Sequence, residues 1–370
     1  MDGPRSVKSE EFPSLSKLLD TVFRPGKTDE MFRLFPIFLS ESNRENILVC
    51  AEEDGTLVSH VGLILRWASI EGCTVGVGGI GAVATYESHR GQGLASQLME
   101  LACRQSNDWG ADFLMISGGR GLYRRLGAAD VGVDTQVTVD PAIRERFRDP
   151  SISLVPAGDA DLAACAALYA TRPCRYLRPM DDWRTYLRAG LCMCKSVRTW
   201  MVRRGAAAVA YLVVAEHPQN QLLEVTEFAG DAAALAAALA LLPASSSDSD
   251  ARIHLEPGDQ ALRAILVASG AACKTVPTMG TMLILNLPRL MDRLQPAFRA
   301  RLGRAYPHLP SVAENSDGSF TFSLGETEWT APGKAEAAQF IFGHPQHQPR
   351  PGDFQKVFPI STLWYGFDYV

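Results

Sequence analysis

Residues 88–96, SHRGQGLAS, join a glycine-rich segment to a stretch with helical periodicity. Gly91 and Gly93 stand one residue apart, and Arg90 comes directly before them. The first turn of a helix has free N–H groups and the positive end of the helix dipole. Glycines there allow unusual backbone angles and remove side chains that would block an approaching phosphate. The stretch therefore predicts either an anion-binding loop or a tight structural turn.

The segments on both sides of this loop have the rhythm of an α/β domain. Residues 74–86, TVGVGGIGAVATY, are rich in β-formers and glycine, which indicates a strand that another backbone or a ligand approaches closely. After the loop, Leu94, Leu98 and Ala102 follow helical spacing, and Gly110 ends that helix. A hairpin precedes this unit, and short strands follow it.

Two other phosphate-binding motifs do not fit. The dinucleotide fingerprint G-x-G-x-x-G requires a third glycine where Ser96 stands, and a hairpin precedes the loop in place of a β-α-β start. The P-loop G-x-x-x-x-G-K-[ST] requires a lysine that the loop lacks.

The composition limits the class of protein. A chain of 370 residues is long enough for two or three domains. The net charge of −5, with both signs interspersed, gives no electrostatic case for nucleic acid or for an acidic membrane surface. The longest apolar run, residues 232–244, is too short to span a bilayer, and the N-terminus has no apolar signal core. We expect a cytoplasmic protein.

Neither cysteine nor histidine spacing predicts a metal site. Cys192 and Cys194 form a C-x-C without a second pair. His344 and His347 lie in a proline-rich loop without a third ligand nearby. We therefore expect reduced thiols and no metal.

The chain divides into three regions. Residues 1–148 contain the glycine loop, residues 149–280 are rich in alanine, and residues 281–370 end in an aromatic tail. The first two regions share an order of helices, hairpin, strand, helix and strand, but the second has no counterpart of RGQG. This order predicts an α/β (α+β) protein with a duplicated mixed-sheet fold and one degraded site.

The loop resembles a known cofactor motif. The pattern Arg90-x-x-Gly93-x-Ala95 between a strand and a helix is similar to the [RQ]-x-x-G-x-[GA] motif of the GNAT N-acetyltransferase superfamily. Tyr123 and Gly127 match that family's Y-x-x-x-G segment, although Ala128 replaces the usual aromatic residue. The resemblance implies that acetyl-CoA is the acetyl donor. The cofactor-binding residues that it implies are Val83, Ala84, Thr85, Arg90, Gly91, Gln92, Gly93, Leu94, Ala95, Ser96, Gly118 and Gly119.

Length and order of regions extend this resemblance to the Enhanced intracellular survival (Eis) family. Such proteins have a catalytic GNAT domain, a second GNAT-like domain without the cofactor loop, and a C-terminal domain like sterol carrier protein. The resemblance assigns these to residues 1–148, 149–280 and 281–370, and it implies a homo-oligomer, a hexamer in that family.

The resemblance also assigns catalytic roles. It implies that Tyr123 is the general acid for the leaving thiolate, since a phenol can protonate a group with the pKa of a thiol. It implies that the carboxylate of Val370, at the end of the tail WYGFDYV, is the base, although the family's last residue is usually aromatic. Asp368 is a rival base, and His89 is a weaker one because it sits beside the phosphate-binding end of the loop.

The expected reaction is direct transfer of acetyl to a primary amine in a ternary complex. The amine is an aminoglycoside, a polyamine or a lysine side chain, and surface acids would attract such cations. Those acids are Glu52, Glu53, Asp54 and Glu71, each of which has the alternative of being a solvated loop charge. The alternatives are an inactive CoA- or lipid-binding protein and an enzyme with a longer acyl donor.

Overall fold

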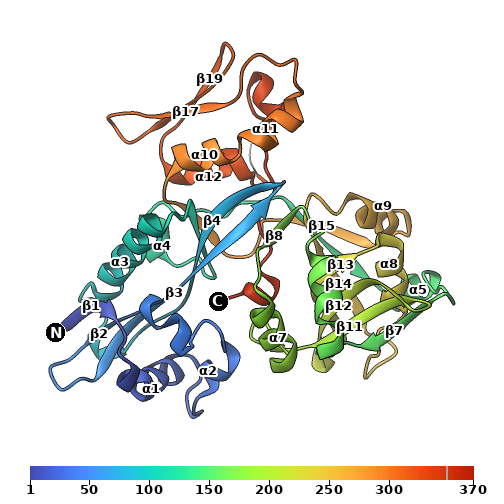
Figure 1. Ribbon diagram of the computed structural model, residues 1–370, viewed down its shortest axis with the longest axis horizontal. Helices are drawn as coiled ribbons and strands as arrows, with labels where there is room; N and C mark the ends of the chain where they lie inside the picture. Colours follow the sequence, from blue (N-terminus) through green and yellow to red (C-terminus); the bar gives the residue numbers. More distant parts are fainter. Residues whose placement is uncertain (347–348) are drawn as a thin grey trace.

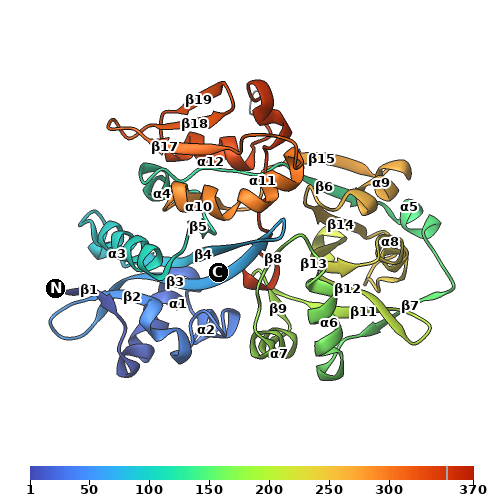
Figure 2. The ribbon, with the colours of Figure 1, turned by 45° about the horizontal axis from the view of Figure 1, so that its top comes forward.

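The computed structural model describes residues 1–346 and 349–370, so His347 lies outside the described residues. Two mixed β-sheets stand side by side, and the C-terminal segment lies above them in the view of Figure 1. The end of the chain returns to a position between the two sheets, as Figures 1 and 2 both show.

The first sheet contains the glycine-rich strand. Its neighbours are antiparallel except for β4 and β5, which run parallel. The short strand β8 (Cys174–Tyr176) pairs with the far end of β3. The strand order is β1 (Asp2–Ser6), β2 (Ile47–Ala51), β3 (Leu57–Ile70), β4 (Cys73–Thr85), β5 (Phe113–Ile116) and β16 (Thr281–Ile284).

Helices cover both faces of this sheet because successive strand residues point to opposite sides. Ile47 and Val49 of β2 pack with α1 (Phe12–Phe23) and α2 (Glu30–Leu34). Leu48 of β2 packs with α3 (Leu94–Trp109), and the short helix α4 (Gly121–Arg125) lies on that same face.

The second sheet repeats the strand order of the first. Its single parallel pair, β13 and β14, stands fourth and fifth from the β7 edge, as β4 and β5 do from the β1 edge. The order is β7 (Ile152–Pro156), β11 (Arg198–Arg204), β12 (Ala207–His217), β13 (Leu222–Gly230), β14 (Asp250–Leu255), β6 (Asp134–Val139) and β15 (Ala272–Val276).

The two sheets exchange one strand each. Strand β6 belongs to the first region by its place in the sequence, but it pairs with β14 and β15 in the second sheet. The sixth place in the first sheet is taken by β16, which was expected to open the third region. Both segments are strands, as the sequence predicted, but local pattern identifies a strand without identifying its partner.

Helices also cover both faces of the second sheet. The short pair β9 (Leu191–Cys192) and β10 (Lys195–Ser196) forms a separate ladder. One face packs with α5 (Pro141–Arg146), α8 (Ala232–Leu241) and α9 (Gln260–Ala268). The other face packs with α6 (Leu162–Tyr169) and α7 (Met180–Ala189).

The remaining segment is an α+β unit with a three-stranded antiparallel sheet. Phe322 and Phe340 form the centre of its aromatic core, with ring centroids 4.9 Å apart. The elements are α10 (Leu287–Arg293), α11 (Gln295–Leu302), β17 (Ser311–Glu314), β18 (Phe320–Leu324), β19 (Thr327–Ala331) and α12 (Lys334–Phe342).

Asp112 connects this segment to the first sheet. Its buried carboxylate accepts hydrogen bonds from Arg289 at 2.9 Å and from Arg293 at 2.6 Å, both on α10. It also accepts the backbone N–H of Gly76 at 2.8 Å. One carboxylate thus fixes the start of β5 against β4 and holds α10 across both.

Replacing Asp112 with alanine should lower the free energy of unfolding by about 3 kcal/mol, the lower end for a broken buried ion pair, because both arginines keep contact with solvent. Urea unfolding measures this loss. The exposed Asp108 on α3 gives a control, since Asp108→Ala should change stability by less than about 0.5 kcal/mol. Equal losses in both variants would contradict the role of Asp112.

Candidate active site

Strands β4 and β5 part halfway along β4, and we call this place the fork. Their pairing begins at Val77 and ends where Ile80 faces Ile116. The last cross-strand bond runs from the Ser117 N–H to the Ile80 carbonyl at 3.2 Å. Strand β4 continues to Thr85 while it pairs only with β3. The edge of β4 that faces β5 beyond Ile80 is therefore free of a strand partner within the described ranges.

A bulge redirects β4 at the fork. Ala82 has a φ of +49°, and the register between β3 and β4 shifts between His60 and Gly62. The imidazole Nδ1 of the fully buried His60 lies 2.7 Å from the Ala82 carbonyl oxygen, which supports this strained position. Burial lowers the pKa of His60 to about 4, so the ring is neutral and donates this hydrogen bond.

The glycine loop enters α3 with its donors free. Gly91 and Gly93 have φ values of +80° and +78°. Gly93 is the N-cap residue of α3, and because it has no side chain it leaves the N–H groups of the first turn without a side-chain acceptor. The first intrahelical bond of α3 runs from the Gln97 N–H to the Gly93 carbonyl, so the preceding N–H groups of the helix face outward. Leu94 anchors the turn in the core. This geometry fits a pyrophosphate.

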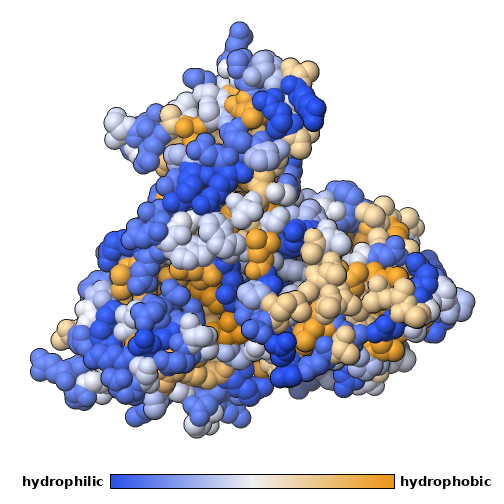
Figure 3. All heavy atoms as spheres, viewed as in Figure 1, coloured by the Kyte–Doolittle hydropathy of each residue, from blue (hydrophilic) through white to orange (hydrophobic). Residues whose placement is uncertain are grey.

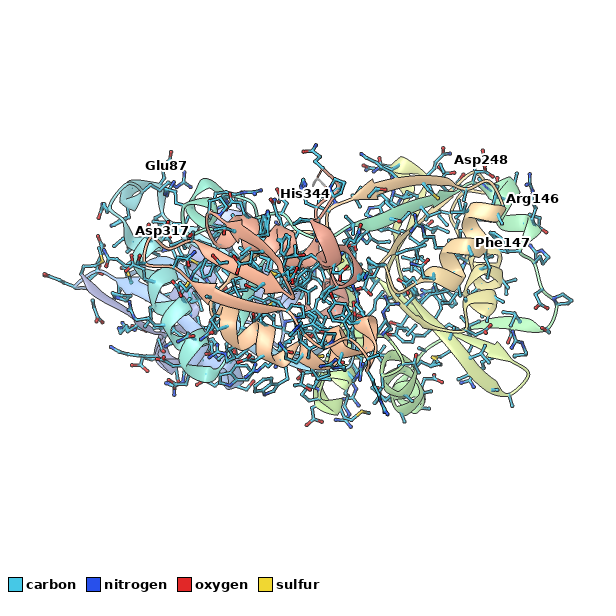
Figure 4. All side chains as sticks on the ribbon, turned by 90° about the horizontal axis from the view of Figure 1, so that it is seen from above. Glu87, Arg146, Phe147, Asp248, Asp317 and His344 are labelled. Carbon is cyan, nitrogen blue, oxygen red and sulfur yellow. The ribbon has the colours of Figure 1, made fainter. Side chains whose placement is uncertain are left out.

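The side chains around this loop lie at the surface. Arg90 and Gln92 are exposed, and Ala95 and Ser96 are half-buried. Glu87, in the turn before the loop, points away from the molecule in Figure 4. An anion could therefore reach the start of α3 from solvent.

Tyr123 lies on the α3 face of the fork. It is 4% exposed and belongs to the same apolar cluster as Ile80 and Ile116. A Cβ on Gly118 would come within 3.5 Å of the Tyr123 ring, so the glycine brings the chain close to the phenol. Burial raises the pKa of Tyr123, although the charge of Arg120 opposes this shift. The phenol therefore stays protonated at neutral pH.

The neighbouring residues of Tyr123 are fixed by the exchanged strand. The Gly118 carbonyl accepts a hydrogen bond from Thr281 on β16 at 2.9 Å. A Cβ on Gly119 would lie 3.9 Å from the methyl group of the same threonine. Arg120 donates to the carbonyl of Val83 across the fork at 3.5 Å. The segment from Gly118 to Tyr123 is therefore held by residues from two strands, β16 and β4.

Val370 lies on the opposite face of the first sheet, in the cluster formed by α1 and α2. It is 4% exposed. A Cβ on Gly81 would overlap its carboxyl carbon, and a Cβ on Gly79 would come within 3.1 Å of its side chain. The prediction that another backbone approaches this glycine-rich strand closely is thus confirmed, because the chain end packs against two of its glycines.

The tail is held by the second sheet. The Arg178 guanidinium, with no exposed surface, donates to Asp368 at 2.7 Å and to Glu227 at 2.9 Å. It also lies 4.2 Å from the ring centroid of Trp183. Burial alone would lower the pKa of Arg178, but the two carboxylates hold it well above its usual value. Gly366 has a φ of +51°, and a Cβ there would overlap the Glu227 carboxylate.

The second sheet has its own fork, and the tail fills it. Pairing between β13 and β14 ends where Val225 faces Ile253. Beyond this point the Trp364 indole donates to the Thr226 carbonyl at 2.6 Å, and the indole stacks on His254 with centroids 4.0 Å apart. The Trp364 indole therefore occupies this fork.

The rival bases are engaged elsewhere. One Asp368 oxygen is bonded to Arg178, and the other lies 4.0 Å from the Arg66 guanidinium. His89 lies 2.9 Å from Glu52, beside the glycine loop.

Glu71 pairs with Arg301. Glu53 and Asp54 are exposed in the turn between β2 and β3. The expected acidic attraction for cations thus has no basis at the fork.

Comparison with known proteins identifies the domain that carries this site. Residues 4–130 match the family model described as Acetyltransferase (GNAT) domain. This part of the chain is therefore similar to GNAT domains. The matched range contains β4, β5, the glycine loop and Tyr123, and it ends before the exchanged strand β6. A search of curated proteins gave no match.

Solved structures extend the similarity in fold to nearly the whole chain. A GCN5-related N-acetyltransferase from Kribbella flavida is 16% identical, with 92% of this chain and 89% of that chain covered and a TM-score of 0.63. One from Anabaena variabilis is 15% identical over 89% and 84%, also at 0.63. Eis1 from Mycobacterium abscessus is 14% identical over 92% and 89%, at 0.58. At these identities the likeness shows the fold.

Within residues 1–346 and 349–370, no three His, Cys, Asp or Glu side chains are grouped so that they could hold a metal ion. No helix in these ranges has the length and apolar character to cross a bilayer.

Sequence reasoning missed Arg178, Glu227 and His60. The first two have no motif, because their partners lie far away in the chain. The glycines at 79 and 81 did give a signal, since strands rarely carry them without a reason for close approach.

Replacing Gly81 with alanine should displace the end of the chain, because the new methyl group would overlap the Val370 carboxyl carbon. Carboxypeptidase should then release Val370 and Tyr369 several-fold faster than from the wild type. Gly158 serves as the control, since a Cβ there meets nothing within 4 Å and its φ of −139° suits any residue. Unchanged release from Gly81→Ala would show that the tail is not seated on β4.

Proposed function

We propose that this chain is an acetyl-CoA-dependent N-acetyltransferase that acetylates a primary amine by direct attack in a ternary complex. The observation that carries the proposal is the position of two groups at one fork. The Tyr123 phenol lies on the α3 face of β4, and the Val370 carboxyl group lies on the opposite face. An acid and a base on either side of one reacting centre suit acyl transfer to an amine.

The fork and the loop together fit a CoA thioester. The free N–H groups at the start of α3 would bind the pyrophosphate, with Arg90, Gln92, Ala95 and Ser96 around it. The edge of β4 at Val83, Ala84 and Thr85 has no strand partner and would hydrogen-bond the pantetheine amides, with Arg120 beside it on the Val83 carbonyl. Acetyl-CoA supplies a thioester carbonyl and a thiolate leaving group.

Residues of this chain accept and donate the protons that the reaction requires. In our assignment the Val370 carboxylate takes the proton from the substrate ammonium group, so that the neutral amine can attack. Tyr123 gives its proton to the departing thiolate, and its raised pKa keeps that proton in place until the thiolate forms. Asp368 serves to hold the tail, since both of its oxygens face arginines.

The other regions keep the roles that the resemblance implies. We assign residues 149–280 to a second GNAT-like domain without a cofactor site, because its sheet repeats the strand order and its fork is filled by Trp364. The likeness of residues 281–370 to sterol carrier protein, the homo-oligomeric assembly and the cytoplasmic location stay predictions.

The loop can be tested separately from catalysis. Gly93→Ala should raise the Kd for CoA at least 10-fold, because it strains the backbone that presents the α3 donors. Gly72→Ala is a matched control, with a φ of +83°, open space around it and a remote position in the β3–β4 turn. Equal CoA binding by both variants, measured by titration calorimetry, would count against the loop.

The acid and the base can be tested together. Tyr123→Phe and a chain extended by three residues past Val370 should each lower kcat about 100-fold, the lower range for loss of general acid–base catalysis. The assay follows thiol release from acetyl-CoA. The same extension placed before Met1, which is exposed, should leave kcat unchanged.

Three outcomes separate the alternatives. Full activity of the C-terminally extended chain would keep the enzyme and reject Val370 as the base. Tight CoA binding without turnover of any amine would favour an inactive CoA-binding protein. Faster turnover with a longer acyl-CoA would reject acetyl as the natural group.

A further inference from the structure

An open pocket lies on the second sheet, on the face opposite α8 and α9. Its free space is about 250 Å³, and its walls come from β13, β14, β6, the end of β15 with the segment after it, and the tail. An apolar cavity of about 150 Å³ is enough to hold benzene, so this pocket admits an aromatic ring with a short side arm. Figure 3 shows apolar residues gathered where Figure 1 places α8 and α9, on the covered side of the sheet.

Strand β14 gives the pocket a polar floor. Ile253 packs with α8 and α9, so Arg252 and His254 on either side of it face the pocket. Strand register places Gln136 of β6 beside His254, and Lys274 of β15 beside Gln136. The three strands therefore present polar side chains on this face, which is the pattern of a sheet whose second face meets solvent or a ligand.

Arg252 brings a positive charge into the pocket. Its Nε is buried there and has no hydrogen-bond partner within residues 1–346 and 349–370. A buried donor of this kind is costly unless water or a ligand satisfies it. A guanidinium binds a carboxylate through two parallel N–H bonds. Lys274, which is exposed on the same face, adds a second positive charge nearby.

The carboxylate that lines the pocket is already compensated. Glu224 accepts hydrogen bonds from the Lys195 Nζ at 2.8 Å on both oxygens, and the His217 Nε2 lies 2.8 Å from one of them. Burial alone would raise the pKa of Glu224, but Lys195 and His217 hold it below its usual value. Glu224 is therefore ionised and paired with these two residues, and the Arg252 guanidinium is left to bind a ligand.

A second carboxylate, Asp134, belongs to the same strand as Gln136 but does not line the pocket. It is fully buried, and one of its oxygens lies 3.0 Å from the His254 Nε2 and accepts a hydrogen bond from Thr278 at 2.6 Å. Protein groups therefore hold this carboxylate away from a ligand in the pocket.

The rest of the pocket lining is largely apolar. The Trp364 indole, which stacks on His254, lines the pocket from the tail. Val276, Pro277 and Met279 line it as well, and Met279 has 37% of its surface exposed. An aromatic ring can stack on the indole and contact the thioether sulfur, and both contacts are favourable. The pocket thus combines an apolar space for a ring with a cation for a carboxylate.

We propose that this pocket is a second ligand site, which binds a small aromatic monocarboxylate such as 3-phenylpropanoate. The carboxylate pairs with Arg252, and the ring lies against Trp364 and Met279. The pocket shares no lining residue with the fork of the first sheet, so this inference goes beyond acetyl transfer and does not depend on it.

The test compares three probes by ligand-detected NMR titration of the full chain without CoA. The probes are 3-phenylpropanoate, 3-phenylpropan-1-ol, which has the same body without the charge, and propanoate, which has the charge without the ring. The Kd for 3-phenylpropanoate should be at least 10-fold lower than that for either of the other probes, because only this acid contacts both the cation and the apolar walls.

Two variants separate the charge from the apolar walls. Arg252→Gln should raise the Kd for 3-phenylpropanoate at least 10-fold and leave the Kd for 3-phenylpropan-1-ol unchanged, which also shows that the variant is folded. Met279→Ala should raise the Kd for both aromatic probes several-fold. Arg263→Gln makes the matched change at an exposed position of α9, on the opposite face of the sheet, and should leave every Kd unchanged.

Two results would overturn the inference. Equal affinity of the wild type for 3-phenylpropanoate and 3-phenylpropan-1-ol would show that Arg252 does not recognise a carboxylate. Equal binding of 3-phenylpropanoate by the wild type and Arg252→Gln would show that the acid binds elsewhere on the chain. Neither result involves acetyl-CoA or turnover, so the proposed function would stand or fall separately.

Discussion

The position of the tail depends on one buried guanidinium. The Arg178 side chain has no exposed surface, and a charge removed from water in this way requires partners that compensate it. Glu227 supplies one partner from β13, and Asp368 supplies the other from the tail. If the tail left, it would leave a buried positive charge with half of its compensation. The ion cluster therefore opposes any rearrangement that moves the last residues of the chain.

The tail connects the two sheets, and each sheet binds it through a different kind of contact. The second sheet binds the tail by polar and aromatic contacts in its own fork, whereas the first sheet accepts the chain end against bare glycines. The second sheet therefore has a structural task although it lacks a glycine loop. The Trp364 indole occupies one fork, and the same tail carries Val370 to the other.

Local signals predicted much of the first domain. The paired glycines of the loop, the glycine-rich strand and the helix from Leu94 were all found where sequence indicated them. The sheets that β6 and β16 join were not predictable in the same way, since β6 pairs in the second sheet and β16 in the first. The partner of a strand that is distant in sequence depends on which sheet has a free edge and on which face of that sheet is apolar. The sequence of the strand alone shows neither property of the partner sheet. Arg178 was missed for a similar reason, because Glu227 and Asp368 lie 49 and 190 residues away.

The exchange of β6 and β16 has a consequence for synthesis on the ribosome. When residue 148 has been made, β5 still has an open edge, and β6 has no sheet to join. The first sheet closes only after Thr281–Ile284 has emerged, when most of the second sheet is already available. The edge of β5 stays unpaired from residue 116 to residue 281, about 165 residues of synthesis, during which its free N–H and C=O groups are exposed to wrong partners. Cotranslational folding of this chain therefore completes the first sheet only after the strands of the second sheet have been made.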